Sequence, residues 1–200
     1  MYGNYSIIEG GVVDAALADL TNGAPQSFQF SDEKVKEMFN TGELWDKLKF
    51  WEEKGYLMGA GSPSGVDTDT SDLGIVQGHA YSILDVFEID GNRLIQLRNP
   101  WGDATEWKGA WSDHSRKWTE KRKRIVYNRM EAKATDLAEL GKEDGVFWMT
   151  LSDFFMNFSQ LFLCRFFDQE YKEIFFESEW NVAKNTAGGC TNNTTCGQNP

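Results

Sequence analysis

Two residues, His79 and Asn99, could form the base half of a nucleophilic active site. His79 opens an apolar, β-prone run that continues to Ile89, and Asn99 follows a second such run that begins at Leu94. Asp90-Gly91-Asn92 lies between the runs and has turn chemistry. An antiparallel pair of strands joined by that turn would bring His79 and Asn99 together. Because an asparagine amide can fix the tautomer of an imidazole that takes a thiol proton, the two are candidate members of a Cys–His–Asn triad.

Each of these residues also has an ordinary interpretation. An isolated histidine at a strand start is often structural, and an asparagine beside a proline is common in turns. Pro100 restricts Asn99 to extended backbone, which helps to fix the direction of its amide. Trp101 would exclude water from the His–Asn hydrogen bond and so strengthen it, a role compatible with plain core packing. His114, the second histidine, lies in a polar stretch and is predicted to be solvated.

None of the three cysteines has the setting of a nucleophile. Cys164 lies in a strand-like apolar run, where a buried and inert thiol is expected. Cys190 and Cys196 lie in a glycine-rich tail, and neither opens a helix. An odd number of cysteines fits a reducing compartment better than a disulfide framework. We therefore interpret all three cysteines as structural.

The composition limits the class of function. The chain has 200 residues, 40% of them hydrophobic, with eight Trp and fourteen Phe, which predicts a packed and β-rich structure. The net charge of −11 argues against nucleic-acid binding, and we interpret the one basic run, 121–124, as a solvated loop. No segment is apolar enough to span a membrane, and no signal sequence is recognisable. These features predict an intracellular, cytoplasmic protein.

Start and stop signals place the other elements around the candidate pair. Helices are predicted over residues 11–20, 33–39 and 44–51, within 120–139, and after a start signal at 150–153. Further strands are predicted at 56–58, 146–149, 161–167 and 171–177.

Five motifs, in this order along the chain, resemble those of the calpains, the calcium-dependent cysteine endopeptidases. The resemblance covers roughly residues 35–200 well and the first thirty weakly. The motifs are Gly78-His79-Ala80-Tyr81-Ser82, Arg98-Asn99-Pro100-Trp101-Gly102, Trp107-x-Gly109-Ala110-Trp111-Ser112-Asp113, Glu143-Asp144-Gly145-Val146-Phe147-Trp148-Met149 and Ala187-Gly188-Gly189-Cys190-x-Asn192.

The resemblance implies an α+β fold, namely the twisted antiparallel β-sheet lobe of a papain-like cysteine protease core with flanking helices. Residues 1–167 would be the C-terminal part of that core, mainly its second lobe. Residues 168–200 would be the truncated start of the β-sandwich domain that follows it. In calpains the first lobe carries the cysteine, in a Gly-x-Cys-Trp motif, and the second lobe carries the histidine and the asparagine.

The implied function is proteolysis of protein substrates, with His79 as acid and base and Asn99 as its orienter. The chain would need the first lobe as a partner and would be inactive alone. The alternative is a catalytically silent calpain-like protein that acts as a calcium-responsive interaction or scaffolding module. A cysteine in a Gly-x-Cys-Trp context upstream of Met1 in the complete gene would favour the protease.

The resemblance also implies a calcium ion held by two loops. Glu106 and Asp113 match the ligands of the first loop, and Asp144 and the main-chain oxygen of Lys142 match those of the second. Val146 stands where the family typically has a further acidic ligand, so weakened binding is expected. The acidic run 67–72 lacks the glycine and the distal glutamate of an EF-hand, and it is predicted to be an exposed loop.

Overall fold

The structure is a computed structural model that describes residues 10–102, 105–132, 144–167, 179 and 181. The chain divides into two units, Met1–Phe166 and Phe167–Pro200, and nearly all described residues belong to the first. Apart from positions 179 and 181, the predicted β-sandwich segment 168–200 therefore lies outside the described residues. The same holds for the predicted strand at 171–177.

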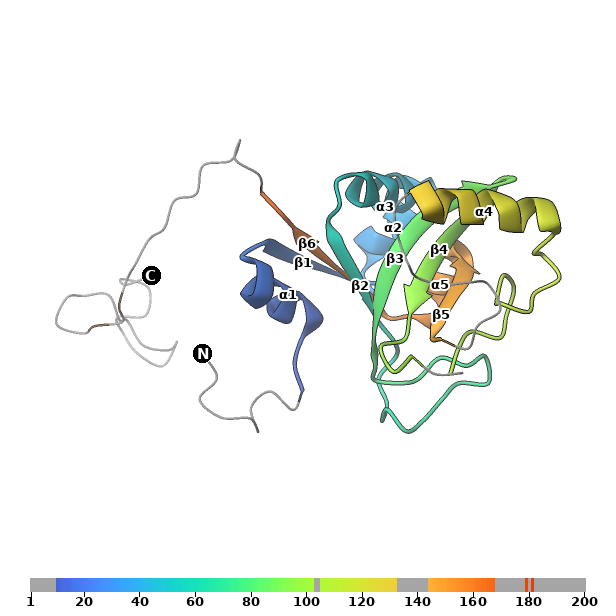
Figure 1. Ribbon diagram of the computed structural model, residues 1–200. Coiled ribbons are helices and arrows are strands. Elements are labelled where there is room, and N and C mark those ends of the chain that lie inside the picture. Colours follow the sequence, from blue (N-terminus) through green and yellow to red (C-terminus); the bar gives the residue numbers. More distant parts are fainter. Residues whose placement is uncertain (1–9, 103–104, 133–143, 168–178, 180, 182–200) are drawn as a thin grey trace. The chain divides into compact units, whose positions relative to one another are not determined.

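The described residues contain six strands, which form one sheet with antiparallel neighbours throughout (Figure 1). The order across the sheet is β1-β6-β2-β3-β4-β5. With helices packed against this sheet, the predicted α+β class is confirmed. The strands are β1 (Ala24–Gln29), β2 (Leu57–Gly61), β3 (Ala80–Ile89), β4 (Asn92–Arg98), β5 (Val146–Thr150) and β6 (Gln160–Arg165).

The helices begin and end where local chemistry favours it. Asp32 caps the second helix by accepting a hydrogen bond from the main-chain N–H of Lys34, and Thr150 caps the fifth by accepting one from that of Asp153. Gly42, with a φ of 86°, separates the second helix from the third. Within the described residues the helices are α1 (Val13–Thr21), α2 (Glu33–Thr41), α3 (Glu43–Glu53), α4 (Glu120–Ala132) and α5 (Leu151–Asn157).

Alternating side chains of the central strands point to opposite faces of the sheet and pack into two separate hydrophobic cores. On β4, Ile95 and Leu97 join the larger core, whereas Leu94 joins the smaller one. The larger core also contains the buried faces of α2, α3 and α5, including Leu44, Trp45 and Phe154. The smaller core includes residues of α4 and three tryptophans on the opposite face of the sheet; they are Trp111, Trp118, Val126, Met130 and Trp148. Both faces of the strands that carry the candidate pair are therefore covered.

A tight turn sets the register of these two strands as far as Asp85, and a β-bulge between Ile83 and Asp85 shifts it by one residue before His79 is reached. Asp90 and Gly91 both have positive φ, 49° and 75°, and Ile89 pairs directly with Asn92. A two-residue hairpin turn of this kind matches the natural twist of antiparallel strands. The predicted β-hairpin is confirmed.

Two sequence predictions differ from the structure. The segment 24–29 forms strand β1, although its sequence predicts no strand. The basic run 121–124 lies in helix α4, so its interpretation as a loop was wrong, whereas the helix predicted within 120–139 is confirmed. Tertiary packing accounts for both differences: β1 pairs with β6, and α4 buries Val126 and Met130 against the sheet.

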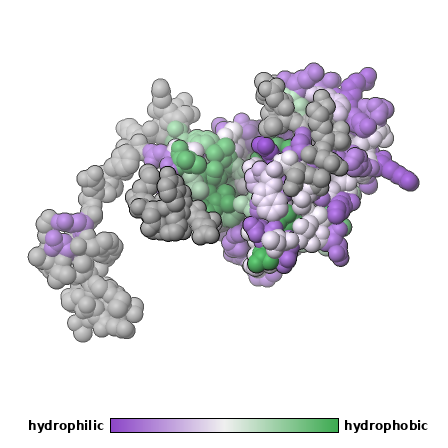
Figure 2. All heavy atoms as spheres, turned by 60° about the horizontal axis from the view of Figure 1, so that its bottom comes forward, coloured by the Kyte–Doolittle hydropathy of each residue, from purple (hydrophilic) through white to green (hydrophobic). Residues whose placement is uncertain are grey.

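Apolar and polar side chains are distributed unevenly over the surface of the described residues. Helix α1 buries no residue, and Leu20, near its end, is 82% exposed. Figure 2 shows the apolar surface gathered at one end of the described unit, with mostly hydrophilic surface elsewhere on this face. The described part of the chain contains no helix with the length and apolar character that a membrane crossing requires.

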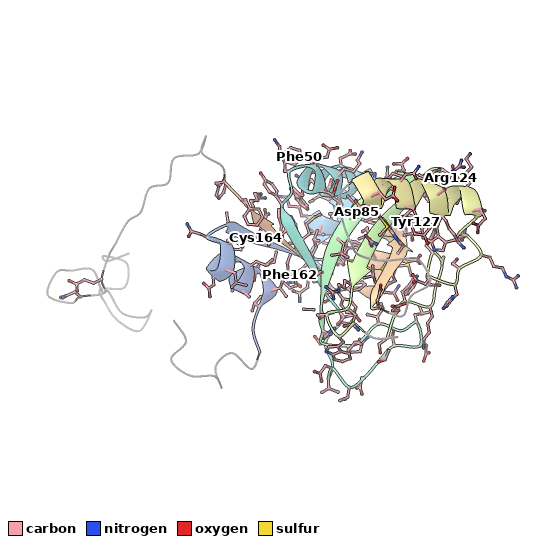
Figure 3. All side chains as sticks on the ribbon, viewed as in Figure 1. Phe50, Asp85, Arg124, Tyr127, Phe162 and Cys164 are labelled. Carbon is pink, nitrogen blue, oxygen red and sulfur yellow. The ribbon has the colours of Figure 1, made fainter. Side chains whose placement is uncertain are left out.

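A buried ion pair holds α4 against the sheet. Arg129 donates two hydrogen bonds of 2.8 Å to the carboxylate of Asp85, a buried residue of β3 (Figure 3). These bonds raise the pKa of Arg129, although its burial acts in the opposite direction. Glu52 of α3 lies 3.5 Å from the same guanidinium, which therefore links α3, α4 and β3.

We expect Arg129→Ala to lower the free energy of unfolding by about 2 kcal/mol, since removal of one partner leaves a buried carboxylate without its bidentate donor. Urea unfolding followed by tryptophan fluorescence measures this. Lys123→Ala is the control, because Lys123 lies on the same helix and only pairs with the exposed Glu120. Its expected effect is below about 1 kcal/mol, and equal effects of the two variants would contradict the assignment.

Candidate active site

The hairpin brings the two candidate residues together. His79 directly precedes β3, and Asn99 directly follows β4, whose last register pair with β3 is Ser82 with Arg98. The Nε2 atom of His79 lies 2.9 Å from the Oδ1 atom of Asn99.

Other hydrogen bonds fix the orientation of the Asn99 amide. Asn99 is fully buried, and its Nδ2 group donates to the carbonyl of Thr105 at 3.2 Å. Its Oδ1 atom also accepts the main-chain N–H of Trp101 at 3.1 Å. Because Oδ1 can only accept, the network assigns the proton of the neutral imidazole to Nε2 of His79. The Nδ1 atom is then left as the basic nitrogen.

Ser62 holds the main chain of His79, and the sequence carried no signal for this role. Its hydroxyl accepts the N–H of His79 at 2.8 Å and donates to the carbonyl of His79 at 3.1 Å. Ser159 donates in turn to the carbonyl of Ser62 at 2.9 Å. Gly78 has a φ of 57°, and a side chain there would meet the carbonyl of Gly65. These contacts therefore fix the main chain of His79, although its side chain is half-buried and its neighbours Gly78 and Ala80 are exposed.

Two aromatic rings contact the imidazole of His79. The ring of Trp101 is 4.5 Å away between centroids, and that of Tyr81 approaches edge-on at 5.2 Å. Tyr81 is buried, whereas Trp101 is 47% exposed. Trp101 thus lies against His79, and its predicted role in excluding water stays a prediction.

Cys164, the cysteine among the described residues, is buried and lies in β6 (Figure 3), and the strand register places it far from His79. Gly61 pairs with both Ala80 and Gln160, which places Gln160 of β6 level with the start of β3. Cys164 is four residues further along β6, or about 13 Å at the rise of a strand. Cys190 and Cys196 lie outside the described residues.

An acidic group, made of the side chains of Glu106, Asp113 and Asp144, borders the candidate pair. Glu106, only 9% exposed, accepts the main-chain N–H of Gly145 at 2.7 Å. Burial raises the pKa of its carboxyl from an ordinary 4.5 to about 7, and the charges of Asp113 and Asp144 add to this, while hydrogen bonds from the main chain oppose it. The structure therefore places three of the predicted calcium ligands within electrostatic reach of one another.

The donor chemistry suits calcium, because all three side chains offer carboxylate oxygens. Within the described ranges, however, no group of three or more His, Cys, Asp or Glu residues is arranged so that it could hold a metal ion. Lys142 lies outside these ranges. Val146 is a buried apolar residue and offers no side-chain ligand. The acidic run 67–72 is largely exposed, as predicted.

Comparison with known proteins gives one family. A model described as calpain family cysteine protease matches residues 1–165. Among similar curated proteins, the rice "Calpain-type cysteine protease ADL1" is 40% identical over all 200 residues, which are 9% of its length. The Arabidopsis thaliana "Calpain-type cysteine protease DEK1" is 39% identical over the same extent. The rat "Calpain-1 catalytic subunit" is 30% identical over 95% of this chain and 26% of its own length.

Proposed function

The chain belongs to the calpain family of cysteine proteases, and from this premise we propose that it supplies the histidine and the asparagine of a calcium-dependent cysteine endopeptidase. The observation that carries the proposal is the hydrogen bond between His79 and the buried Asn99. The chain spans 9% of the length of the first relatives it matches, and the activity of the whole protein is therefore part of this proposal.

The proposed mechanism uses Nδ1 of His79 as the base. With Nε2–H held by Asn99, Nδ1 takes the proton of a cysteine thiol, and the thiolate attacks the carbonyl carbon of a peptide bond. The imidazolium then donates that proton to the leaving amine as the C–N bond breaks. Water hydrolyses the resulting thioester with His79 again as base, which regenerates the thiol. Trp101 limits access of water to the His–Asn bond in this proposal.

The nucleophile comes from another part of the protein in this proposal. Cys164 is buried and distant from His79, and we propose a structural role for it, as for Cys190 and Cys196. Residues 1–167 then form mainly the second lobe of the protease core, and 168–200 begin a β-sandwich domain. The first lobe is the required partner, proteins are the substrates, and a reducing cytoplasm suits a catalytic thiol.

Hydrolysis of a fluorogenic peptide tests the proposal. The chain is combined with a separately produced first lobe of the same protein, with calcium in excess. Hydrolysis that needs both parts supports the protease. No hydrolysis from the combined lobes, or from the complete protein, supports the alternative of a catalytically silent calcium-responsive interaction or scaffolding module.

We further propose that the acidic group binds calcium. Glu106, Asp113 and Asp144 would hold the ion together with the main-chain oxygen of Lys142. Calcium would supply positive charge where burial and like charges already disfavour the ionised form of Glu106. Since Val146 adds no carboxylate, we expect an affinity lower than that of a site with one more acidic ligand.

Isothermal titration with calcium tests this assignment. We expect heat from the wild-type chain and a loss of at least about tenfold in affinity for Asp113→Ala, since calcium affinity follows the number of charged ligands. Asp67→Ala is the matched control: it removes one carboxylate from the exposed acidic run and should leave the titration unchanged. Equal heats for the wild type and Asp113→Ala would contradict the site.

A further inference from the structure

We propose that Glu106 is a positioning residue for the candidate catalytic pair. Through Gly145 and Thr105 it closes a ring of hydrogen bonds that holds Asn99, and through Asn99 it sets the tautomer of His79. This role is separate from calcium binding, and it rests on the proposed function only in treating His79 and Asn99 as catalytic.

The ring consists of three hydrogen bonds and one peptide bond. Glu106 Oε1 accepts the N–H of Gly145 at 2.7 Å, and the carbonyl of Gly145 accepts the N–H of Asn99 at 2.8 Å. The side chain of Asn99 donates from Nδ2 to the carbonyl of Thr105 at 3.2 Å. Thr105 is bonded to Glu106, which closes the ring. Asn99 is thus held at its main chain by Gly145 and at its side chain by Thr105, and Glu106 links these two segments.

Close packing restricts the movement of the residues that form this ring of hydrogen bonds. Gly145 has a φ of 81°, and a Cβ atom there would come within 2.7 Å of the carbonyl oxygen of Asn99. Gly74 lies against the main chain of Glu106, where a Cβ atom would be 1.9 Å from the carbonyl oxygen. The N–H of Lys108 donates to Leu73 at 2.9 Å and so anchors the same loop from its other side. Both ends of the Glu106–Gly145 bond are therefore fixed.

A carboxylate is well suited to this position. The ionised form of Glu106, which prevails above its raised pKa of about 7, makes a shorter and stronger hydrogen bond to an N–H group than a neutral acceptor does. The bond from Gly145 to Glu106 is buried, where a donor without a partner would be costly.

The chemical consequence lies in the direction of the Asn99 amide. If Asn99 gave up its hydrogen bonds to Thr105 and to the N–H of Trp101 and turned over, its NH₂ group would face Nε2 of His79. Nε2 would then have to accept, and the proton of the neutral ring would move to Nδ1. An imidazole that is protonated at Nδ1 cannot take a thiol proton at that atom. By linking Gly145 and Thr105, Glu106 keeps Nδ1 as the basic nitrogen of His79, on the side of the imidazole away from Asn99.

Nuclear magnetic resonance of the isolated chain tests the proposal without any need for activity. The chain has two histidines, His79 and His114, so the ring ¹⁵N signals are readily assigned. In calcium-free buffer, Glu106→Ala should lower the ratio of the Nε2–H to the Nδ1–H tautomer of His79 by about tenfold, the effect of losing one typical hydrogen bond. Glu106→Gln keeps an acceptor oxygen and should preserve most of that ratio. An unchanged ratio in Glu106→Ala would overturn the proposal.

Asp113→Ala is the matched control, because it removes a charge from the same acidic group, and Asp113 supplies none of the three hydrogen bonds of the ring. It should leave the tautomer ratio of His79 as in the wild type. A shift as large as that of Glu106→Ala would mean that charge, and not the hydrogen bond, acts on His79, and the proposal would be wrong. Failure of the proposed protease function would leave these spectra unaffected, so the two proposals are tested separately.

Amide hydrogen exchange decides the matter if Glu106→Ala does not fold. In Glu106→Gln, whose neutral amide is a weaker acceptor, the N–H of Gly145 should lose about tenfold in protection. The N–H of Ile95, in the core of β4, should keep its protection. Equal protection of Gly145 in Glu106→Gln and in the wild type would overturn the proposal.

Discussion

Replacing His79 by alanine is expected to lower kcat/KM for peptide hydrolysis by about 10⁴-fold, measured with the chain and the first lobe combined at saturating calcium. The reason is that the variant has no group to take the thiol proton or to return it to the leaving amine. Asn99 holds the imidazole in a single orientation, so the wild-type base requires no reorganisation before it acts.

His114→Ala is the control for this variant. His114 is exposed and is the second of the two histidines in the chain. Its removal should leave kcat/KM within about twofold of the wild type, as expected for a solvated surface residue. A loss of tenfold or less for His79→Ala, in a protein shown to fold and to bind the first lobe, would contradict the role of His79 as base.

Replacing Gly145 by alanine is expected to lower the free energy of unfolding by about 4 kcal/mol. Two causes add: a left-handed backbone is costly for a residue with a Cβ atom, and that atom would meet the carbonyl oxygen of Asn99 at 2.7 Å. Relief of the contact requires a shift of Asn99 or of Gly102, so the hydrogen bond to His79 should weaken as well. Urea unfolding and the ring ¹⁵N signals of His79 measure the two effects.

Gly91→Ala separates the two causes. Gly91 has a φ of 75°, close to the 81° of Gly145, but a Cβ atom there would meet nothing within 4 Å. The control should therefore show the conformational cost alone, about 1–2 kcal/mol. Equal losses for the two variants would mean that the contact with Asn99 contributes nothing.

Local signals in the sequence predicted most of the elements. Asp32 and Thr150 act as the helix caps that their positions indicate, and Asp90-Gly91 makes the turn that aligns His79 with Asn99. The approach of the two candidate residues could be predicted because a two-residue hairpin pairs the strands that carry them, whereas the β-bulge between Ile83 and Asp85, which shifts the register by one residue, could not. Such features depend on neighbours in the chain, which a sequence displays directly.

The missed features depend on neighbours that are distant in the chain. Strand β1 has a polar, proline-containing sequence and is a strand because β6, more than a hundred residues later, pairs with it. Ser62 bonds to the main chain of His79 and Glu106 to that of Gly145, and both hydrogen bonds arise only in the folded sheet and its loops. No spacing rule reveals such contacts. The calcium ligands and the catalytic roles were expectations from family resemblance, and they stay proposals here.

The central claim is that His79, held by Asn99, activates a cysteine of the first lobe. The most direct test measures the alkylation rate of that cysteine by iodoacetamide between about pH 5 and pH 9, with mass spectrometry to identify the modified peptide. With the wild-type chain bound, we predict a reaction midpoint well below pH 8.5, because an imidazolium stabilises the thiolate. With His79→Ala bound, the midpoint should return to about 8.5, the ordinary thiol pKa. The same midpoint for both chains would contradict the claim.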